Sequence, residues 1–338
     1  DTGSAGSIES SYPVQLKSGA AFVLNGGSIT STKGAAVDIY SSAENVLVEI
    51  NGGAVNAASS DNAIGVRGKT NVIVNINGGK ITTGSNNRLA MYISGDKDDS
   101  IQVNITSGEI TSNGQTIQAY SGAEINVSGD AVISSATGTA ISTQSGYGVV
   151  ELNVTGGTIK TEGARAYAVY ARESSDVNIS GGAISGGYGL RASDNADVAV
   201  SGGTVEGSIS AISVSDSANV TVTGGAFNKD VSGYIDSSAA VAEFSAEGKK
   251  TYVVGVTIAE KAAEAAAGTE INVTKGSVAL TDVSTDVKVK NTGDAEVTVN
   301  GVDVPDDGTV VSACDHALTD VAETAATCTS EGVKAHKK

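Results

Sequence analysis

Six polar residues recur at the same place in a repeated phrase, and four of them are carboxylates. Each opens a short run of alternating apolar and polar residues, as Glu151 opens ELNV and Asp176 opens DVNI. If these runs are parallel strands about 4.8 Å apart, the carboxylates form one column. Carboxylates this close together repel one another, so their side chains either turn into solvent or share a cation. The alternative is that Asp, Glu and Asn are favoured at the start of a strand because their side chains hydrogen-bond to nearby backbone. The column comprises Gln102, Glu124, Glu151, Asp176, Asp197 and Asn219.

A second set of residues combines aromatic rings with guanidinium and amide groups. They occupy outward positions of another short apolar run, such as Val169-Tyr170-Ala171. Aromatic faces pack against sugar C–H surfaces while Arg and Gln satisfy hydroxyl groups, so such a face can hold an extended glycan or a protein partner. The alternative is surface decoration, because exposed Tyr is favoured on strands by propensity alone. The set comprises Tyr92, Tyr170 and Arg191 in one column, and Tyr40, Arg67, Tyr120, Gln144 and Arg172 in the next.

Common catalytic motifs are absent from the sequence. It has no Gly-x-Ser-x-Gly elbow, phosphate loop or His-Glu-x-x-His. Both histidines, His316 and His336, lie near the C-terminus, so the repeats carry no imidazole for general-base chemistry. We assign no catalytic residue and expect a non-enzymatic protein. Cys314 and Cys328 can form a disulfide, remain free, or supply half of a zinc site with His316; outside the cell we expect the disulfide.

The polar columns depend on an internal repeat. In each copy an alternating run predicts a strand with one buried face, a glycine-rich pair predicts a tight corner, and a short second strand, a variable loop and a third strand follow. The glycine corners recur every 21–29 residues. The nine copies are FVLNGGSI (22–29), VEINGGAV (48–55), VNINGGKI (74–81), VNITSGEI (103–110), INVSGDAV (125–132), LNVTGGTI (152–159), VNISGGAI (177–184), VAVSGGTV (198–205) and VTVTGGAF (220–227).

The inward positions of the first strand predict stacked aliphatic layers. With no proline between Pro13 and Pro305, every central strand can take part in a ladder. The pattern predicts an all-β fold, a right-handed parallel β-helix of about nine coils of 21–29 residues with three strands per coil. Beside the carboxylates, Asn75, Asn104, Asn126, Asn153 and Asn178 form a second outward column, in which stacked amides can hydrogen-bond along the ladder. The inward column is Ile50, Ile76, Ile105, Val127, Val154, Ile179, Val200 and Val222.

The repeat also divides the chain. Residues 1–19 are expected to be an N-terminal lead-in or cap, and 20–245 the β-helix with a C-terminal cap. A small α+β or β-rich domain is predicted at 246–311, with one helix at 258–267. Residues 312–338 are expected to be a truncated, Cys-containing unit.

Charge and hydropathy exclude some classes of partner and location. The formal net charge of −17 opposes binding to nucleic acid, which requires basic patches. No run of 18 apolar residues predicts a membrane span. The start DTGSAGSIESS lacks the basic and apolar regions of a signal peptide, and we expect that such a peptide was removed or omitted from an extracellular or cell-surface protein.

The phrases V-x-I-S-G-G and GGAFNKDVSGYI resemble pectate-lyase-like β-helix regions of large extracellular proteins from Gram-positive gut bacteria. The resemblance implies an adhesin or glycan-binding surface protein, and some such proteins carry polysaccharide-degrading β-helices. Similarity to β-helix lyases implies calcium held between carboxylates, with an Arg or Lys side chain as the base. The implied calcium ligands are Glu124, Glu151, Asp176 and Asp197.

The C-terminal tail carries a second resemblance. The segment CDHALTDVAETAATCTSEGVKAH resembles a short repeated module and stops before the Cys-x-x-Cys that usually follows in that module.

Three functions remain open at this point. The leading hypothesis is a non-catalytic, adhesin-like or glycan-binding surface protein that uses the Tyr/Arg columns to bind an extracellular glycan or a host or bacterial surface protein. The first alternative is a calcium-dependent polysaccharide lyase or a carboxylate-based glycosidase. The second is a structural stalk that spaces other domains from the cell.

Overall fold

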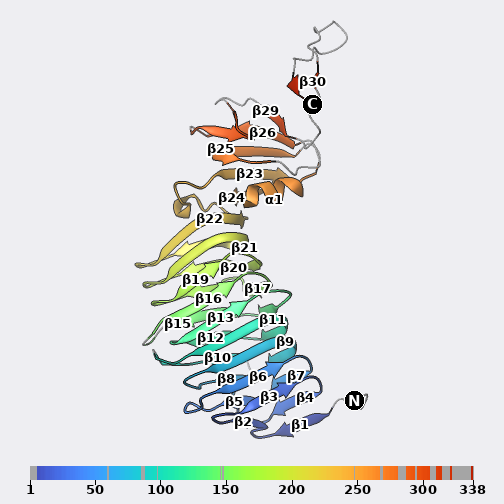
Figure 1. The fold of residues 1–338 in the computed structure, drawn as a ribbon, viewed down its shortest axis with the longest axis vertical. Coiled ribbons are helices and arrows are strands. Elements are labelled where there is room, and N and C mark those ends of the chain that lie inside the picture. Colours follow the sequence, from blue (N-terminus) through green and yellow to red (C-terminus); the bar gives the residue numbers. More distant parts are fainter. Residues whose placement is uncertain are drawn as a thin grey trace. The chain divides into compact units, whose positions relative to one another are not determined.

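The structure is a computed structural model that describes residues 6–58, 61–84, 88–96, 98–144, 146, 148–246, 248–266, 269–280, 287–293, 295–304, 310–313, 320–321 and 336–337. The chain divides into two compact units, Asp1–Ala239 with Lys250–Thr257 and Ala240–Lys249 with Ile258–Lys338. The first unit is a parallel β-solenoid, whose coils follow one another from β1 to β22 in Figure 1.

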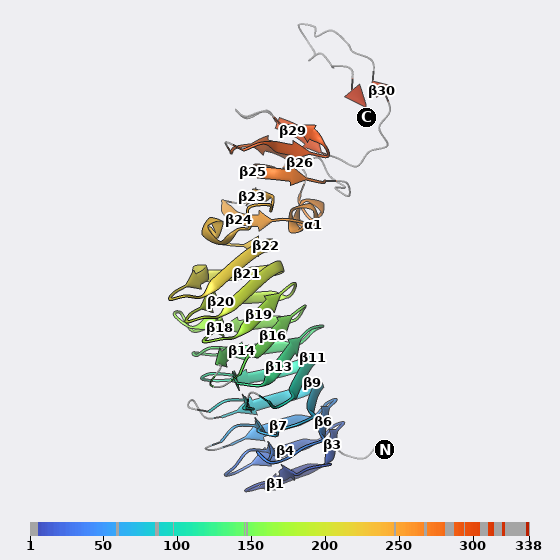
Figure 2. The ribbon, with the colours of Figure 1, turned by 60° about the vertical axis from the view of Figure 1, so that its left-hand side comes forward.

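The first ladder of the solenoid contains the strand that precedes each glycine corner. Successive strands pair in parallel and in register, so that Asn126 lies between Asn104 and Asn153. Figure 2 shows β13, β16 and β19 following one another in this ladder. The strands are β3 (Ala21–Leu24), β6 (Val46–Ile50), the first parts of β9 (Val72–Thr83) and β11 (Ile101–Ser112), β13 (Ala123–Val127), β16 (Val150–Val154), β19 (Asp176–Ile179), and the first parts of β21 (Asp197–Val214) and β22 (Asn219–Phe227).

The second and third ladders complete each coil, as the repeat predicts. The second ladder contains β1 (Ser7–Ser10), β4 (Ser28–Ser31), β7 (Ala54–Ala57), the later parts of β9 and β11, β14 (Val132–Ser135), β17 (Thr158–Thr161), the start of β20 (Ala183–Ala192), and parts of β21 and β22. The third contains β2 (Val14–Leu16), β5 (Val37–Ile39), β8 (Ile64–Val66), β10 (Met91–Ile93), β12 (Ile117–Tyr120), β15 (Ile141–Gln144), β18 (Tyr167–Ala171), and the ends of β20 and β21.

The corner between the first two ladders is built from glycine because its backbone is left-handed. At Gly53, where φ is 81°, a Cβ atom would lie 2.5 Å from the carbonyl oxygen of Gly27 in the preceding coil. Only a residue without a side chain fits both the dihedral angle and the close approach. The corner glycines with positive φ are Gly27, Gly53, Gly79, Gly108, Gly129, Gly157, Gly182, Gly203 and Gly225, all nine of the predicted positions.

The core is the predicted stack of thin aliphatic layers. Val154, for example, pairs with Val127 on one side and Ile179 on the other. Each residue of the predicted inward column is at most 1% exposed. Burying one such side chain stabilises the fold by about 1.5–3 kcal/mol, so the repeated layers supply the stability that the scarce aromatic residues do not. The parallel solenoid with three strands per coil is therefore confirmed.

The number of coils is about 11 rather than nine. Residues 1–19, predicted as a lead-in, already contain two strands, because β1 pairs with β4 and β2 pairs with β5. Gly6 continues the corner column, since its carbonyl accepts a hydrogen bond from the Ser28 backbone N–H. At the other end Ile235 forms a parallel bridge with Val222, just after the short helix η1 (Ser232–Tyr234).

The division between the units differs from the predicted boundary at 245/246. β24 (Lys249–Val254) pairs antiparallel with the end of β22 and belongs mostly to the solenoid, whereas β23 (Val241–Ala246) pairs with β25 (Glu270–Val278) in the second unit. The boundary therefore passes between strands that are adjacent in sequence but paired differently.

The second unit is β-rich, as predicted. β25 pairs in parallel with β26 (Val287–Asn291) and β27 (Val297–Val299). β27 pairs antiparallel with β28 (Val302–Asp303), and β26 with β29 (Val310–Ala313). The helix α1 (Thr257–Ala263) ends earlier than the predicted 258–267, and β30 (Asp320–Val321) pairs with β31 (His336–Lys337).

Candidate binding face

The eight residues predicted for glycan contact lie along the third ladder, and we call them the Tyr/Arg face. Tyr120 pairs in register with Gln144, and Tyr170 with Arg191, so the two predicted columns are present. All eight side chains are half-buried. Half-buried rings in fixed columns form a surface that is both exposed and restrained. The face comprises Tyr40, Arg67, Tyr92, Tyr120, Gln144, Tyr170, Arg172 and Arg191.

The Arg67 end of this face contains an ion pair beneath an aromatic ring. Arg67 Nη1 lies 2.9 Å from Asp38 Oδ1, and its guanidinium lies 5.8 Å from the centre of the Tyr92 ring. Burial raises the pKa of the Asp38 carboxyl above its ordinary value; Arg67 acts against this shift and Asp61 adds to it. The charge of Arg67 is thus largely neutralised within the protein.

The middle of the face is joined by hydrogen bonds. The Gln118 amide donates to the Tyr120 hydroxyl at 2.9 Å, and the Gln144 amide donates to the Glu173 carboxylate at 3.0 Å. The rings of Tyr92 and Tyr120 are 5.6 Å apart. Burial raises the pKa of Tyr120, helped by Tyr92 and Glu173 and opposed by Arg172. These contacts fix the orientation of the exposed groups before any ligand arrives.

The Arg191 end contains three tyrosines and two guanidinium groups. The Tyr167 ring lies 4.8 Å from Tyr170 and 5.2 Å from Tyr188, measured between ring centres. The guanidinium of Arg191 lies 5.7 Å from the Tyr167 ring, and that of Arg172 lies 5.2 Å from the Tyr170 ring. Stacking of this kind suits Arg, whose planar guanidinium packs on aromatic faces.

A hollow of about 540 Å³ opens beside the Arg67 end. Its lining includes Arg67 and Tyr92 from the predicted set. The Nε2 atom of Gln115 is buried there without a hydrogen-bond partner. Amide, carboxylate, phenol and guanidinium groups in one concave site can donate and accept hydrogen bonds in several directions. The lining is Asp61, Asn62, Arg67, Arg88, Leu89, Tyr92, Gln115 and Gln118.

Several residues of the face were missed by sequence reasoning. Gln118 stands in register with Tyr92, and the alternation of β12 would have placed it outward. Tyr167 was missed because β18 begins two residues before the predicted strand and interrupts its alternation, leaving Tyr167 and Tyr170 three residues apart on the same side. No local pattern indicates Asp38 as the partner of Arg67, because 29 residues separate them.

The predicted carboxylate column is in register on the first ladder. Glu124 pairs with Glu151, Glu151 with Asp176, and Asp176 with Asp197. Its ends are held by amides, since Gln102 donates to Glu124 at 3.2 Å and Asn219 donates to Asp197 at 3.0 Å. In the part of the chain that the structure describes, no group of three His, Cys, Asp or Glu side chains is arranged to hold a metal ion. The calcium site remains a prediction.

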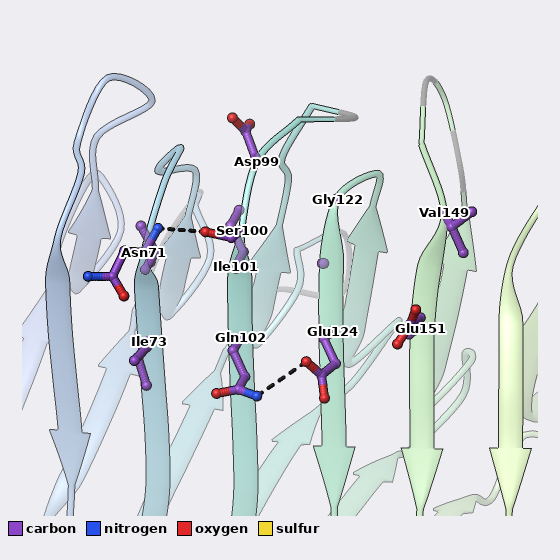
Figure 3. A pocket seen from close by; sticks show the side chains of 12 residues that line it. Asn71, Ile73, Asp99, Ser100, Ile101, Gln102, Gly122, Glu124, Val149 and Glu151 are labelled. Carbon is purple, nitrogen blue, oxygen red and sulfur yellow. Dashed lines mark hydrogen bonds between the residues drawn. The ribbon is translucent and has the colours of Figure 1, made fainter.

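The adjacent asparagine column forms the predicted hydrogen-bonded ladder. From Asn104 onward, each amide nitrogen donates to the amide oxygen of the preceding coil over 2.9–3.1 Å, in the series Asn75, Asn104, Asn126, Asn153 and Asn178. A second hollow of about 540 Å³ lies where the strands of this ladder begin, and its lining combines apolar residues with the polar residues Asn71, Asp99, Ser100, Gln102, Glu124 and Glu151. Figure 3 shows Gln102 and Glu124 joined on neighbouring strands, with Glu151 on the next.

The remaining predicted groups carry less information. Cys314, Cys328 and His316 lie outside the described residues. Among the described residues, none of the helices combines the length and apolar character needed to span a bilayer.

No protein family model, curated protein or solved structure matches this chain.

Proposed function

We propose that the chain is a non-catalytic bacterial surface or secreted protein that binds an extracellular glycan along the Tyr/Arg face. The observation that carries this proposal is the hollow beside Tyr92, where a ring backed by Arg67 borders a concave site lined by amides and charged groups. A sugar ring has apolar C–H surfaces edged by hydroxyl groups, and this combination of ring and hydrogen-bonding groups complements both.

The restraint of the face favours binding. Tyr has only two side-chain dihedral angles to immobilise, so an exposed Tyr contributes contact area at low entropic cost. Here the Tyr92 ring already contacts Tyr120 and the Arg67 guanidinium. Because these groups are oriented beforehand, less of the contact energy with a ligand is lost to ordering the protein side chains.

The non-catalytic part of the proposal is supported by the distribution of reactive side chains. No His or Cys precedes Cys314 in the sequence. The Tyr/Arg face therefore contains neither an imidazole base nor a thiol nucleophile, the groups most often used for proton transfer and covalent catalysis.

The proposal is tested by screening the full chain against immobilised neutral and acidic glycans, followed by titration calorimetry. Tyr92→Ala should weaken binding about tenfold, as expected for loss of an aromatic anchor. Tyr92→Phe should bind nearly as the wild type, because it keeps the ring. Tyr12→Ala is the matched control: Tyr12 is 56% exposed and lies outside the face.

Two results would overturn glycan binding along the Tyr/Arg face. One is the absence of any glycan ligand, which would favour a structural stalk. The other is equal loss of affinity in Tyr92→Ala and Tyr12→Ala, which would place the contact elsewhere.

A second candidate, a calcium-dependent polysaccharide lyase, is favoured by the in-register carboxylates Glu124, Glu151 and Asp176. It predicts calcium binding that Glu151→Gln weakens, and ultraviolet absorbance from an unsaturated product when polyuronate is added. If calorimetry detects no calcium and no absorbance develops, this candidate is excluded.

A further inference from the structure

The Arg191 end carries positive charge that no carboxylate neutralises. Both guanidinium groups face the same ring, with Arg172 at 5.2 Å and Arg191 at 5.8 Å from the centre of Tyr170. Among the described residues, neither is within ion-pair distance of a carboxylate oxygen, in contrast to Arg67 beside Asp38. Two cations beside one ring are thus left with aromatic and neutral partners.

The hydrogen bonds of the two arginines leave donors unused. Arg191 donates to the hydroxyl groups of Ser213 and Ser215 at 2.9 and 3.0 Å. Arg172 makes no such bond within the described part of the chain, and its Nε is buried without a partner. A guanidinium presents five N–H donors in a planar fork, and this arrangement fits an anion with two oxygens in one plane.

Two acidic residues close to these arginines in the sequence have hydrogen-bond partners of their own. The carboxylate of Glu173 accepts from the Gln144 amide, and that of Asp194 accepts from the Ser193 hydroxyl at 2.9 Å and from the Glu173 backbone N–H. In the part of the chain that the structure describes, these sequence neighbours, Glu173 and Asp194, thus accept hydrogen bonds from neutral donors.

We propose that the cluster of Tyr167, Tyr170, Tyr188, Arg172 and Arg191 binds an anionic substituent, carboxylate or sulfate, on the sugar ring of an acidic glycan. This inference rests on the proposed function and names its ligand class. The tyrosine rings supply a surface for the sugar, and the two guanidinium groups pair with its anion. Since the whole protein carries a net charge of −17, an acidic ligand is repelled by most of the surface, and this cluster sets where it docks.

The test uses three polymers that share one sugar backbone and differ in the charged group they carry. Dextran, carboxymethyl dextran and dextran sulfate are titrated into the full chain at two salt concentrations. The two acidic polymers should bind at least about tenfold more tightly than dextran, and Arg172→Gln or Arg191→Gln should each weaken them about tenfold. Added salt should reduce the preference, because it screens charge. A larger effect on one acidic polymer than on the other identifies the anion.

Matched variants separate this inference from general electrostatics. Lys229→Gln removes one exposed positive charge outside the cluster and should leave the preference intact. Lys69→Gln, which removes another exposed positive charge outside the cluster and outside the Tyr/Arg face, should preserve it as well. Circular dichroism confirms that each variant keeps its strand content.

The outcomes distinguish the two proposals. The acidic-ligand site is overturned if all three polymers bind equally or if the acidic polymers do not bind. It is also overturned if the double variant Arg172→Gln/Arg191→Gln keeps the preference for acidic polymers over dextran. If the glycan screen still finds a neutral ligand that depends on Tyr92, the proposed function stands without it. If the screen finds no ligand at all, both fall.

Discussion

The two ends of the Tyr/Arg face place a guanidinium at the same distance from a tyrosine ring, but with opposite electrostatic results. Arg67 lies 5.8 Å from Tyr92, and Arg191 lies 5.8 Å from Tyr170. The neighbouring coil supplies Asp38 to Arg67, whereas it supplies the Ser213 hydroxyl to Arg191. A stacked ladder can therefore repeat one contact while the adjacent coil decides whether its charge is available to a ligand.

A glycine makes the difference possible. Asp38, Gly65 and Tyr92 occupy successive positions of one column. A Cβ atom on Gly65 would lie 2.8 Å from Asp38 Oδ1 and 3.5 Å from the guanidinium carbon of Arg67. The ion pair thus fills the space that a side chain would occupy. At the other end, Tyr170 and Arg191 are direct neighbours in register, with no glycine between them in the column.

The largest expected effect comes from breaking the ladder that carries both ends. Gly129, between Tyr120 and Gln144 in the chain, has φ of 58°, and a Cβ there would lie 2.3 Å from the carbonyl oxygen of Thr106. Gly129→Ala should lower the free energy of unfolding by at least roughly 1–2 kcal/mol from the left-handed backbone alone. The shift of the neighbouring coil adds to this loss. Chemical denaturation followed by circular dichroism measures it.

The control for this prediction is another corner glycine. Gly26 has no positive φ, and no atom lies within 4 Å of the position that a Cβ would take there. Gly26→Ala should therefore change the free energy of unfolding by less than about 0.5 kcal/mol. Equal losses in the two variants would contradict the assignment of strain to the left-handed corner.

The next prediction compares the two arginines directly. Arg67→Ala leaves the Asp38 carboxylate, whose side chain is only 14% exposed, without its counter-charge, and should cost about 1 kcal/mol at neutral pH. Arg191→Ala should cost about half as much, because the half-buried hydroxyls of Ser213 and Ser215 can bond water instead. Urea denaturation of both variants gives the comparison. A larger loss in Arg191→Ala would mean that its guanidinium is the structural one.

The columns at both ends could be predicted from sequence because the repeat is regular. In each coil, apolar and polar residues alternate with a period of two and a glycine marks the corner. This pattern places Ile179 inward and Tyr170 outward without knowledge of any contact. The first coil was missed because Ala5-Gly6-Ser7-Ile8 keeps only half of the phrase and has no aliphatic run before it. Coil count is therefore least predictable at the ends, where the pattern is incomplete.

The charge difference between the ends could not be predicted in the same way. It depends on which side chains cross from one coil to the next, and this depends on rotamers and on the space left by Gly65. From the sequence alone, the outward positions of Arg67, Arg172 and Arg191 cannot be distinguished. Only the structure shows that the first is paired with an acid and the others are not.

A smaller effect concerns the pH dependence of the Arg67 end. Because burial raises the folded-state pKa of Asp38, the folded protein holds this proton more tightly than the unfolded chain. The stability contributed by Asp38 is therefore present below its unfolded pKa and lost as pH rises through its folded pKa. The difference in unfolding free energy between wild type and Asp38→Asn should fall over that window. It should fall further in an Arg67→Gln background, since Arg67 lowers the pKa. No change between backgrounds would contradict the ion pair.

The smallest effect tests which end controls the ring between them. Burial raises the pKa of Tyr120, Arg172 lowers it and Glu173 raises it. Arg172→Gln should therefore raise the Tyr120 pKa further and Glu173→Gln should lower it, whereas Arg67→Gln should change it less than either. Carbon-13 NMR of labelled tyrosine, titrated through the phenol range, follows this ring once its signal has been assigned with Tyr120→Phe. A larger shift from Arg67→Gln would show that the field of the Arg67 end extends past its ion pair, and the contrast between a neutralised and an available guanidinium would then fail.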